Sequence, residues 1–461
     1  MKETLNKNEC YTARIEGYSS DASGICRIGG MTVFVPYALS GETARIKIVK
    51  VLSSYAYGIV EEISEPSPER TVPVCPYYYR CGGCSTQHMT YREELRFKSE
   101  IVRDCLRHIS HLPVPDLPVA GSALECGYRN KATFSFANRN GKIVFGFYRD
   151  RSHDVIPIDT CFIQAEISSQ IAARLTDLLN RYGFSAYDES SGSGHIRHLF
   201  IRTARRTGET IVCITSARGF GDKTAKITEE LVSAFPEIVG VVLDIDKQLG
   251  NKLLKGEFHV LHGRDSIEDI LCGLRFRISP LSFYQVNSPQ AEKLYEKVRE
   301  YAIRDNEENI LDLYCGIGTI SLYLSQFSKK VIGVEIIESA VENAKENARI
   351  NGISNAEFYC SDAAAFKQYT DEIGFKPDCI VVDPPRKGLD RKTITDIISY
   401  APPRIVYVSC NPSTLARDLA VFLENGYELS DLSAFDMFPK TSHVETVCCL
   451  YNQKKDFTSV P

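Results

Sequence analysis

The chain has 461 residues, of which 43% are hydrophobic and 25% are charged. This composition is too apolar for a disordered polyelectrolyte, and the length leaves room for about three domains rather than one small module. The net charge of −5 excludes a uniformly basic nucleic-acid binder, so any binding to nucleic acid must depend on local patches.

The sequence indicates neither secretion nor membrane insertion. The amino-terminal residues lack an apolar core, and no run of eighteen apolar residues occurs in the chain. Sixteen cysteines are too few for a disulfide scaffold of this length. We therefore expect a cytoplasmic protein, without a membrane partner, whose cysteines are thiols, metal ligands or nucleophiles.

The first 65 residues predict a small β-barrel. Short strands separated by glycine-containing turns are expected at 11–15, 24–28, 31–36, 42–52 and 57–63. Five strands in so short a segment are typical of an oligonucleotide-binding (OB-like) barrel, whose curved face can hold single-stranded nucleic acid. A barrel used only for packing remains the alternative.

A linker and a helix follow the barrel. Pro66 and Pro68 predict extended backbone and a domain boundary, because each proline pushes the preceding residue out of helical geometry. Thr90 and Glu93 have the spacing of a capping box at the start of an amphipathic helix. The apolar stripe that we expect in the core comprises Leu95, Ile101, Val102, Cys105, Leu106 and Ile109.

Residues 127–285 predict an α+β region. Strands are expected at 132–137, 143–148, 196–203, 210–215, 238–244 and 257–262, with a helix around 161–182. Four arginines lie close together without an acid among them, at Arg197, Arg202, Arg205 and Arg206. They indicate either a phosphate-binding strand face or a solvated edge strand.

From residue 288 onward, helices and strands alternate. Helices are expected at 289–303, 319–326 and 338–350, and strands at 309–314, 330–335, 356–360, 378–383, 403–409 and 446–451. Repeated βαβ units predict a doubly wound, mainly parallel sheet of the Rossmann-like α/β class.

Four cysteines form a candidate ligand set. Cys75, Cys81 and Cys84 lie on one short glycine-containing loop, and Cys161 follows much later. Three thiols on one loop with a remote fourth can hold a metal ion or a cluster. The five-residue gap between Cys75 and Cys81 is wider than usual zinc spacing, so it favours an iron–sulfur cluster, with structural zinc left as the alternative.

Acidic residues at successive strand ends predict a cofactor crevice. Asp312 ends the first strand before the glycines Gly316 and Gly318, Glu335 ends the second, and Asp362 follows the third. The position of a third dinucleotide-binding glycine holds serine, which favours S-adenosylmethionine over a dinucleotide. Glu335 can accept hydrogen bonds from ribose hydroxyls, and Asp362 can accept one from an adenine amino group.

The last two strands carry candidate catalytic groups. Asp383 is followed by two prolines and Arg386, where amino-group methyltransferases have an aromatic ring, so amino methylation is disfavoured. Cys410 precedes a helix start at Asn411, a position that is expected to lower a thiol pKa. A buried, inert cysteine is the alternative, and Glu445 alone would be an ordinary loop acid.

Together these motifs resemble the RNA (uracil-5-)-methyltransferase family over essentially the whole chain, in particular its 23S ribosomal members with a TRAM barrel and an iron–sulfur cluster. The resemblance implies that Cys75, Cys81, Cys84 and Cys161 hold a 4Fe-4S cluster. It implies S-adenosylmethionine contacts for Gln285, Tyr314, Glu335 and Asp383. It also implies that Cys410 is the nucleophile and that Glu445 is the base.

The expected protein is therefore multidomain. It has a TRAM barrel at 1–65, a central α+β region with the cluster at 66–285 and a methyltransferase domain at 286–461. The expected activity is methylation of carbon 5 of a uridine in 23S ribosomal RNA through a cysteine adduct, by a monomer that binds RNA. A tRNA uracil methyltransferase and a non-catalytic RNA-binding protein are the alternatives.

Overall fold

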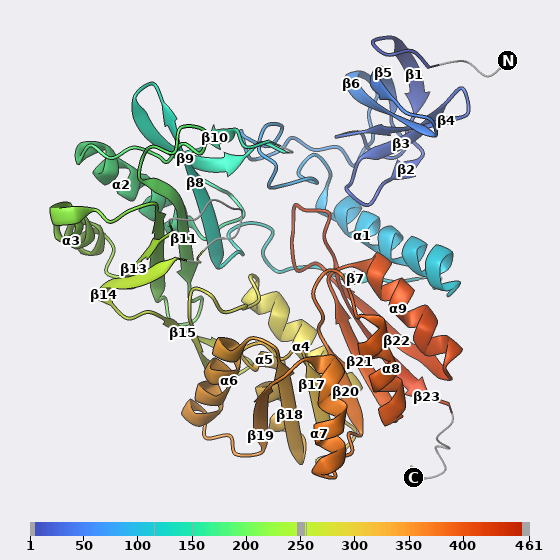
Figure 1. Ribbon diagram of the computed structural model, residues 1–461. Helices are drawn as coiled ribbons and strands as arrows, with labels where there is room; N and C mark the ends of the chain where they lie inside the picture. The colour runs from blue at the N-terminus through green and yellow to red at the C-terminus, as the bar shows by residue number, and fades with distance from the viewer. Residues whose placement is uncertain (1–4, 115, 151, 247–253, 255, 454–461) are drawn as a thin grey trace.

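The computed structural model describes residues 5–114, 116–150, 152–246, 254 and 256–453. Its first unit is a small barrel whose five predicted strands are all present, together with the two-residue β2 (Figure 1). The strands are β1 (Cys10–Arg14), β2 (Gly17–Tyr18), β3 (Gly24–Ile28), β4 (Met31–Val35), β5 (Thr43–Val51) and β6 (Tyr55–Glu65).

One continuous segment closes this barrel. The sheet order is β1-β5-β6-β4-β3-β2, so β1 and β2 occupy opposite edges although they follow each other in sequence. The Ile15 amide donates to the Glu42 carbonyl at 2.8 Å, and the Glu16 amide donates to the Ile25 carbonyl at 2.7 Å. These bonds continue the pairing of β1 with β5 and of β2 with β3, so the segment that contains β1 and β2 joins β5 to β3 and closes the barrel.

Helix α1 (Tyr91–Cys105) begins as predicted and ends in one π-helical turn, η1 (Leu106–Ser110). The hydroxyl of Thr90 accepts a hydrogen bond from the Glu93 amide at 3.3 Å. Val102 and Leu106 are buried with residues of α9 (Pro412–Glu424), whereas Ile109 is exposed, contrary to the expected stripe. The helix therefore packs on the C-terminal sheet, and its buried face is partly charged.

The central sheet has seven strands in the order β10-β9-β8-β11-β12-β13-β14, and a hairpin of β15 and β16 follows it. Helices α2 and α3 and the inner face of the sheet share one apolar core. The elements are β8 (Lys131–Arg139), β9 (Lys142–Tyr148), β10 (Val155–Pro157), α2 (Glu166–Arg181), β11 (Ile196–Thr203), β12 (Thr210–Ser216), η2 (Gly221–Lys223), α3 (Thr224–Ala234), β13 (Ile238–Ile245), β14 (Glu257–Gly263), β15 (Ile267–Leu271) and β16 (Leu274–Ile278).

Both interpretations of the arginine-rich strand are wrong for its two buried members. β11 pairs with β8 on one side and β12 on the other, so it is a central strand. Arg202 is 1% exposed and donates to the carbonyls of Ser279 and Ser282 at 3.2 and 2.8 Å. Arg197 is also buried, with its guanidinium 4.1 Å from the centroid of the Tyr187 ring. Of the four arginines, only Arg205 and Arg206 are exposed.

The C-terminal sheet has eight strands in the order β19-β18-β17-β20-β21-β23-β22-β7. The strands from β19 to β21 are parallel, as predicted, and the chain reverses its direction of winding between β17 and β20. The elements are β7 (Val119–Ala120), α4 (Ser288–Ala302), β17 (Asn309–Leu313), α5 (Thr319–Ser325), β18 (Lys330–Glu335), α6 (Glu338–Ile350), β19 (Ala356–Cys360), η3 (Ala363–Ala365), α7 (Phe366–Glu372), β20 (Cys379–Val382), α8 (Arg391–Tyr400), β21 (Arg404–Ser409), β22 (Tyr427–Phe435) and β23 (Glu445–Asn452).

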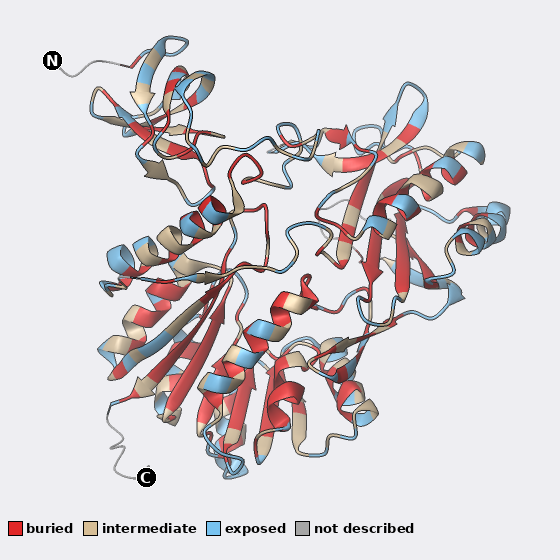
Figure 2. Cartoon of the chain, turned by 180° about the vertical axis from the view of Figure 1, so that it is seen from behind, coloured by how far each residue is buried: buried red, intermediate tan, exposed pale blue. Residues whose placement is uncertain are grey.

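The edge of this sheet comes from a distant part of the sequence. β7 pairs in parallel with β22, through Val119 with Ala434 and Ala120 with Phe435. α1 and β7, which lie within the expected central domain at 66–285, thus pack with the C-terminal sheet and its helix α9. In Figure 2 most strands of the two large sheets are red, which marks buried residues. In the described part of the chain, no helix is both long and apolar enough to cross a membrane.

Candidate active site

The cofactor crevice lies at the carboxyl ends of β17 and β18, beside the point where the winding reverses, which is where open α/β sheets bind ligands. Asp312 is 1% exposed, and its Oδ2 accepts from the Ser321 hydroxyl at 2.5 Å while its Oδ1 has no partner. Desolvation raises the pKa of Asp312 to about 7 despite that bond, and Asp383 and Glu335 add to the rise.

The backbone after β17 turns sharply. Tyr314 has a φ of 70° and Gly318 a φ of 82°, which is a left-handed conformation at both positions. A Cβ on Gly318 would lie 2.9 Å from the Phe358 ring, so glycine is required there by contact as well as by backbone angle. The Gly316 amide donates to Glu335 Oε2 at 3.2 Å, which joins the turn to the next strand end.

Glu335 and Asp362 lie beside this turn, whereas Gln285 lies on the segment before α4. Glu335 Oε1 also accepts from the Ile337 amide at 3.0 Å. Burial is the largest cause of the raised pKa of Tyr314, and the exposed Asp362 lies close enough to add to the rise. Gln285 is 4% exposed, and its backbone carbonyl accepts from Asn130 Nδ2 at 2.8 Å. The structure therefore gathers the acidic set at one sheet edge and buries Gln285 on the segment before α4.

Strand register places the two candidate catalytic groups side by side. β21 and β23 are antiparallel, with Ser409 opposite Thr446. Cys410 and Glu445 are the next residues beyond that pair, so they leave the sheet at the same edge. Asn411 caps α9 by accepting from the Ser413 amide at 3.1 Å, and Pro412 is the first helical residue. The predicted local structure around Cys410 is thus present.

The lowered pKa that a helix start predicts for the Cys410 thiol is absent. Burial, together with the neighbouring Glu445 and Asp383, raises the pKa of Cys410 to about 11, while Arg386 opposes the rise. Removal of a thiol from water and two adjacent carboxylates outweigh the helix terminus. Cys410 is therefore protonated at neutral pH in the free protein, contrary to the thiolate predicted from sequence.

The carboxylates beside the thiol are perturbed in the same direction. Glu445 is 4% exposed, and desolvation raises its pKa well above the usual value, with Asp383 adding to the rise and Arg386 opposing it. Desolvation also raises the pKa of Asp383 to about 7. A raised pKa makes a carboxylate a stronger base, and the pKa of about 7 for Asp383 lies near physiological pH.

Two further residues at this edge were assigned no role from sequence. The Arg386 guanidinium lies 3.2 Å from His443 Nε2. Burial, with Arg386 next, lowers the pKa of His443 to about 4, so the ring is neutral. The available signal was their position, because Arg386 follows Asp383 closely and His443 precedes Glu445 by two residues.

The four candidate ligand thiols line one cavity of about 710 Å³ that also reaches the barrel, the central sheet, Arg386 and His443. Burial raises the pKa of Cys84 to about 12 and that of Cys161 to about 11, and Cys75 and Cys81 add to both rises. In the described ranges, no group of three or more His, Cys, Asp or Glu side chains is placed to hold a metal ion. All sixteen cysteines are unbridged, as expected.

A doubly wound sheet with an acidic crevice at its switch point, joined to a nucleic-acid-type barrel, is the architecture of an S-adenosylmethionine-dependent RNA methyltransferase. Comparison with known proteins agrees. The model of the tRNA (uracil-5-)-methyltransferase family matches residues 90–454, and that of the TRAM domain matches residues 5–60. The chain belongs to the RNA (uracil-5-)-methyltransferase family and carries an N-terminal TRAM domain.

Relatives match over nearly their whole lengths. An uncharacterized RNA methyltransferase of Oceanobacillus iheyensis is 41% identical over 449 residues, which cover 97% of each chain. One from Clostridium tetani is 40% identical over 457 residues, 98% of each chain. Among solved structures, the Pyrococcus abyssi tRNA (uracil-54, C5)-methyltransferase in complex with S-adenosyl-L-homocysteine has a TM-score of 0.75 and 27% identity, and the match covers 95% of this chain and 99% of that one.

Proposed function

We propose that the protein methylates carbon 5 of a uridine in 23S ribosomal RNA, through a covalent bond between Cys410 and the uracil ring. The observation that carries this proposal is the adjacency of Cys410 and Glu445 at the end of β21 and β23, beside the crevice acid Asp383. A non-catalytic RNA-binding protein would have no use for a nucleophile and a buried carboxylate at one position. Membership of the methyltransferase family disfavours that alternative too.

In the first half of the reaction, Cys410 activates the ring. Carbon 5 of uracil is too weak a nucleophile to attack a sulfonium methyl group directly. The thiol proton is released to water, the sulfur bonds to carbon 6, and the electron pair of the 5,6 double bond moves into an enolate. Carbon 5 then forms a bond to the methyl carbon, the sulfonium–methyl bond breaks, and S-adenosylhomocysteine leaves as a neutral thioether.

In the second half, Glu445 completes the exchange. Its carboxylate accepts the proton from carbon 5, and the electron pair of that carbon–hydrogen bond re-forms the 5,6 double bond. The bond between carbon 6 and sulfur then breaks and releases the thiolate. Burial raises the pKa of Glu445, and a carboxylate with a raised pKa is a stronger base than an ordinary one.

The crevice residues are assigned to S-adenosylmethionine. Glu335 is assigned to the ribose hydroxyls and Asp362 to the adenine amino group, and Gln285, Tyr314 and Asp383 are assigned to the same cofactor. Asp312 together with Gly316 and Gly318 shapes the turn against which the cofactor lies. Support comes from the unpartnered Oδ1 of the buried Asp312 and from the left-handed turn that only small or strained residues adopt.

We further propose that Cys75, Cys81, Cys84 and Cys161 hold a 4Fe-4S cluster. A single tetrahedral ion draws thiolates to about 2.3 Å from one centre, whereas a cubane spreads its ligands over four irons. The observation that supports a shared ligand is that all four thiols line one cavity. Since methyl transfer is redox-neutral, the cluster would have a structural role. It would link the cysteine loop to the segment before α2.

The RNA substrate is the part of the proposal that needs a direct test. The solved tRNA enzyme from Pyrococcus abyssi makes tRNA the second candidate. Mapping 5-methyluridine in both RNAs of a strain lacking this protein discriminates between them. We expect one or more sites to vanish from 23S ribosomal RNA with tRNA unchanged, and a loss confined to tRNA would overturn the assignment. A cytoplasmic location and a monomeric state remain predictions.

A further inference from the structure

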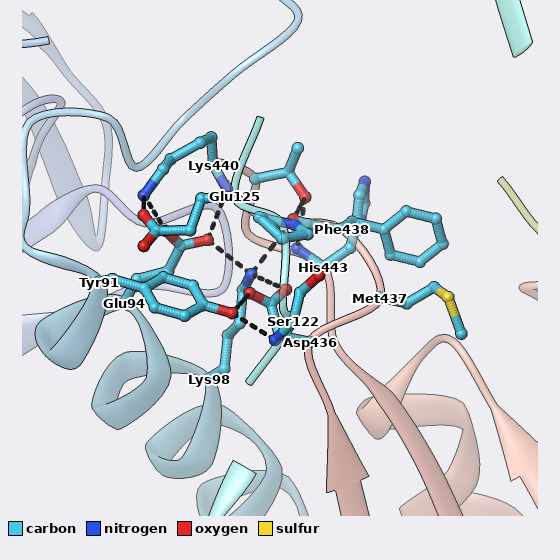
Figure 3. Close-up of polar contacts among 12 residues, drawn as sticks. Tyr91, Glu94, Lys98, Ser122, Glu125, Asp436, Met437, Phe438, Lys440 and His443 are labelled. Carbon is cyan, nitrogen blue, oxygen red and sulfur yellow. Dashed lines mark hydrogen bonds and ion pairs between the residues drawn. The ribbon is translucent and has the colours of Figure 1, made fainter. Parts of the chain in front are cut away.

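A fully buried ion cluster joins α1 to the loop before the proposed base (Figure 3). The side chains of Lys98, Glu94 and Asp436 are each 0% exposed. Lys98 Nζ lies 2.7 Å from Glu94 Oε1 and 2.6 Å from Asp436 Oδ1, and it donates to the Phe438 carbonyl at 3.2 Å. All three ammonium protons therefore have acceptors.

The two carboxylates are fully engaged as well. Asp436 Oδ2 accepts from the Tyr91 hydroxyl at 2.8 Å, and the Tyr91 hydroxyl oxygen accepts from the Ser122 amide at 2.7 Å. Glu94 Oε1 also accepts from the Lys440 amide at 2.6 Å. Burying three charges costs several kcal/mol per ion. Apolar side chains of similar volume often give a protein that is equally stable or more stable. Stability alone is thus a weak reason for such a cluster, and fixed geometry is a better one.

The cluster acts on one loop. β22 and β23 form a hairpin in which Phe435 is opposite Glu445, so residues 436–444 are the connection between them. Further bonds reach the same stretch: Asn287 Nδ2 donates to the Met437 carbonyl at 3.2 Å, the Tyr128 hydroxyl to Pro439 at 3.0 Å and the Ser85 amide to Lys440 at 2.9 Å. The first half of the loop is thereby fixed at successive residues.

Cys410 does not depend on these bonds. It lies on the turn between β21 and α9, where Asn411 caps the helix and donates through its Nδ2 to the Arg386 carbonyl at 3.0 Å. Glu445 is the first residue of β23, at the end of the loop 436–444 whose first half is anchored. A disturbance of the loop therefore reaches the base through the chain itself, whereas it reaches the turn of Cys410 through the side-chain contact between His443 and Arg386.

We propose that Lys98, with Glu94 and Asp436, positions Glu445 for the proton-removal step and has little effect on thiol addition or methyl transfer. This inference rests on the proposed function, because it takes Glu445 as the base. Lys98 is a positioning residue in this account, since it acts through the loop and contacts no reacting atom.

The test uses variants of graded severity in the full-length protein. Tyr91→Phe removes one hydrogen bond to Asp436, Asp436→Asn removes a charge, and Lys98→Met removes the centre of the cluster. Asp104→Asn is the matched control, because it breaks an exposed ion pair with Arg107 on the same stretch of chain. Each variant is mixed with substrate RNA and radiolabelled S-adenosylmethionine in a single turnover, quenched by denaturation at intervals, and scored for label in RNA and for protein–RNA adduct.

We expect label to enter RNA within about twofold of the wild-type rate in all variants. Adduct decay should slow about tenfold in Tyr91→Phe and Asp436→Asn and about a hundredfold in Lys98→Met, since a small misplacement of a catalytic group has effects of that size. The Asp104→Asn control should decay at the wild-type rate. Unchanged decay in Tyr91→Phe and Asp436→Asn, or equal slowing of both steps, would overturn the positioning role.

Two safeguards keep the outcome decisive. If Lys98→Met does not fold, the milder variants decide alone. Glu445→Gln is run in parallel as the reference for a missing base. If it traps no adduct, the proposed function itself has failed; if it traps adduct while the cluster variants release RNA at the wild-type rate, only the positioning role has failed.

Discussion

Two regions of the molecule bring reactive groups together from distant parts of the chain, but they do so differently. The catalytic edge is the end of β21 and β23 where Cys410 and Glu445 lie. The thiol cavity is the one lined by Cys75, Cys81, Cys84 and Cys161. At the catalytic edge, hydrogen bonds between strands determine which residues are neighbours, because the register of β21 and β23 places Cys410 beside Glu445. In the thiol cavity, three cysteines lie on a loop without strand or helix, and Cys161 lies before α2. The ladder orders the catalytic residues without a ligand, whereas the proposed cluster would hold the cysteine loop.

The largest expected effect is at the catalytic edge. Cys410→Ala leaves no nucleophile for carbon 6, so methylation should fall by at least about a thousandfold and no adduct should form. Binding of S-adenosylmethionine should be retained, because the thiol is not part of the crevice turn. Methyl incorporation into RNA and isothermal titration with the cofactor measure the two effects.

Cys360→Ser serves as the control, because that thiol is exposed at the end of β19. It should methylate normally. Methylation by Cys410→Ala would refute the covalent route, and loss of cofactor binding would show that the substitution disturbs the crevice.

The second prediction concerns the thiol cavity. Protein purified without oxygen should contain about four irons with matching acid-labile sulfide, and Cys161→Ala should lose both, because one ligand of the cubane is missing. Chelation of the iron from the wild type should increase proteolysis within the loop 75–87, while the Cys410 edge stays protected. Iron and sulfide analysis with limited proteolysis tests this dependence on the ligand.

Cys105→Ala is the matched thiol, since Cys105 lies on α1 near Ser413 and outside the cavity. It should retain its iron. Stoichiometric zinc without sulfide would reject the cluster, and equal iron in the two variants would mean that Cys161 is not a ligand.

A third prediction follows from the raised pKa of Cys410, which is about 11. Below that value the protonated thiol dominates, so the thiolate fraction rises about tenfold with each pH unit. Adduct formation under single-turnover conditions should therefore accelerate from pH 6 to pH 9 with a slope near one on logarithmic axes. A flat profile would show that the thiol is already ionised when RNA is bound.

The smallest expected effect separates two arginines of the central region. Arg202→Ala leaves the buried carbonyls of Ser279 and Ser282 without a donor, so unfolding free energy should fall by about 3 kcal/mol. Arg205→Ala at the exposed end should change stability by less than about 0.5 kcal/mol. Denaturant titrations compare the two, and similar destabilisation by both would contradict the burial of Arg202.

Local patterns predicted most of the strands and helices, because alternation and capping residues are local signals. The glycine turn after β17 and the acids at the strand ends could be found in the same way, since parallel strands bring their carboxyl ends to one edge. The adjacency of Cys410 and Glu445 could not, because the sequence does not reveal that β23 inserts beside β21 in the opposite direction.

Other errors came from effects at long range. The arginine strand was misinterpreted because β8 covers one side of β11, which no feature of the strand itself reveals. Helix α1 was expected to bury an apolar stripe, yet it buries Glu94 and Lys98, whose partner Asp436 is more than 330 residues away. The sequence predicts a lowered pKa for Cys410, whereas burial raises it, and so do Glu445 and Asp383, which only the fold brings to the thiol.

The central claim is that Cys410 and Glu445 act in successive halves of one covalent cycle. Intact-mass analysis of Glu445→Gln, after incubation with substrate RNA and S-adenosylmethionine, tests it most directly. The account predicts a protein–RNA adduct that already carries the transferred methyl group, because addition and methyl transfer precede proton removal. Normal turnover without an adduct would contradict it, as would an adduct that lacks the methyl group.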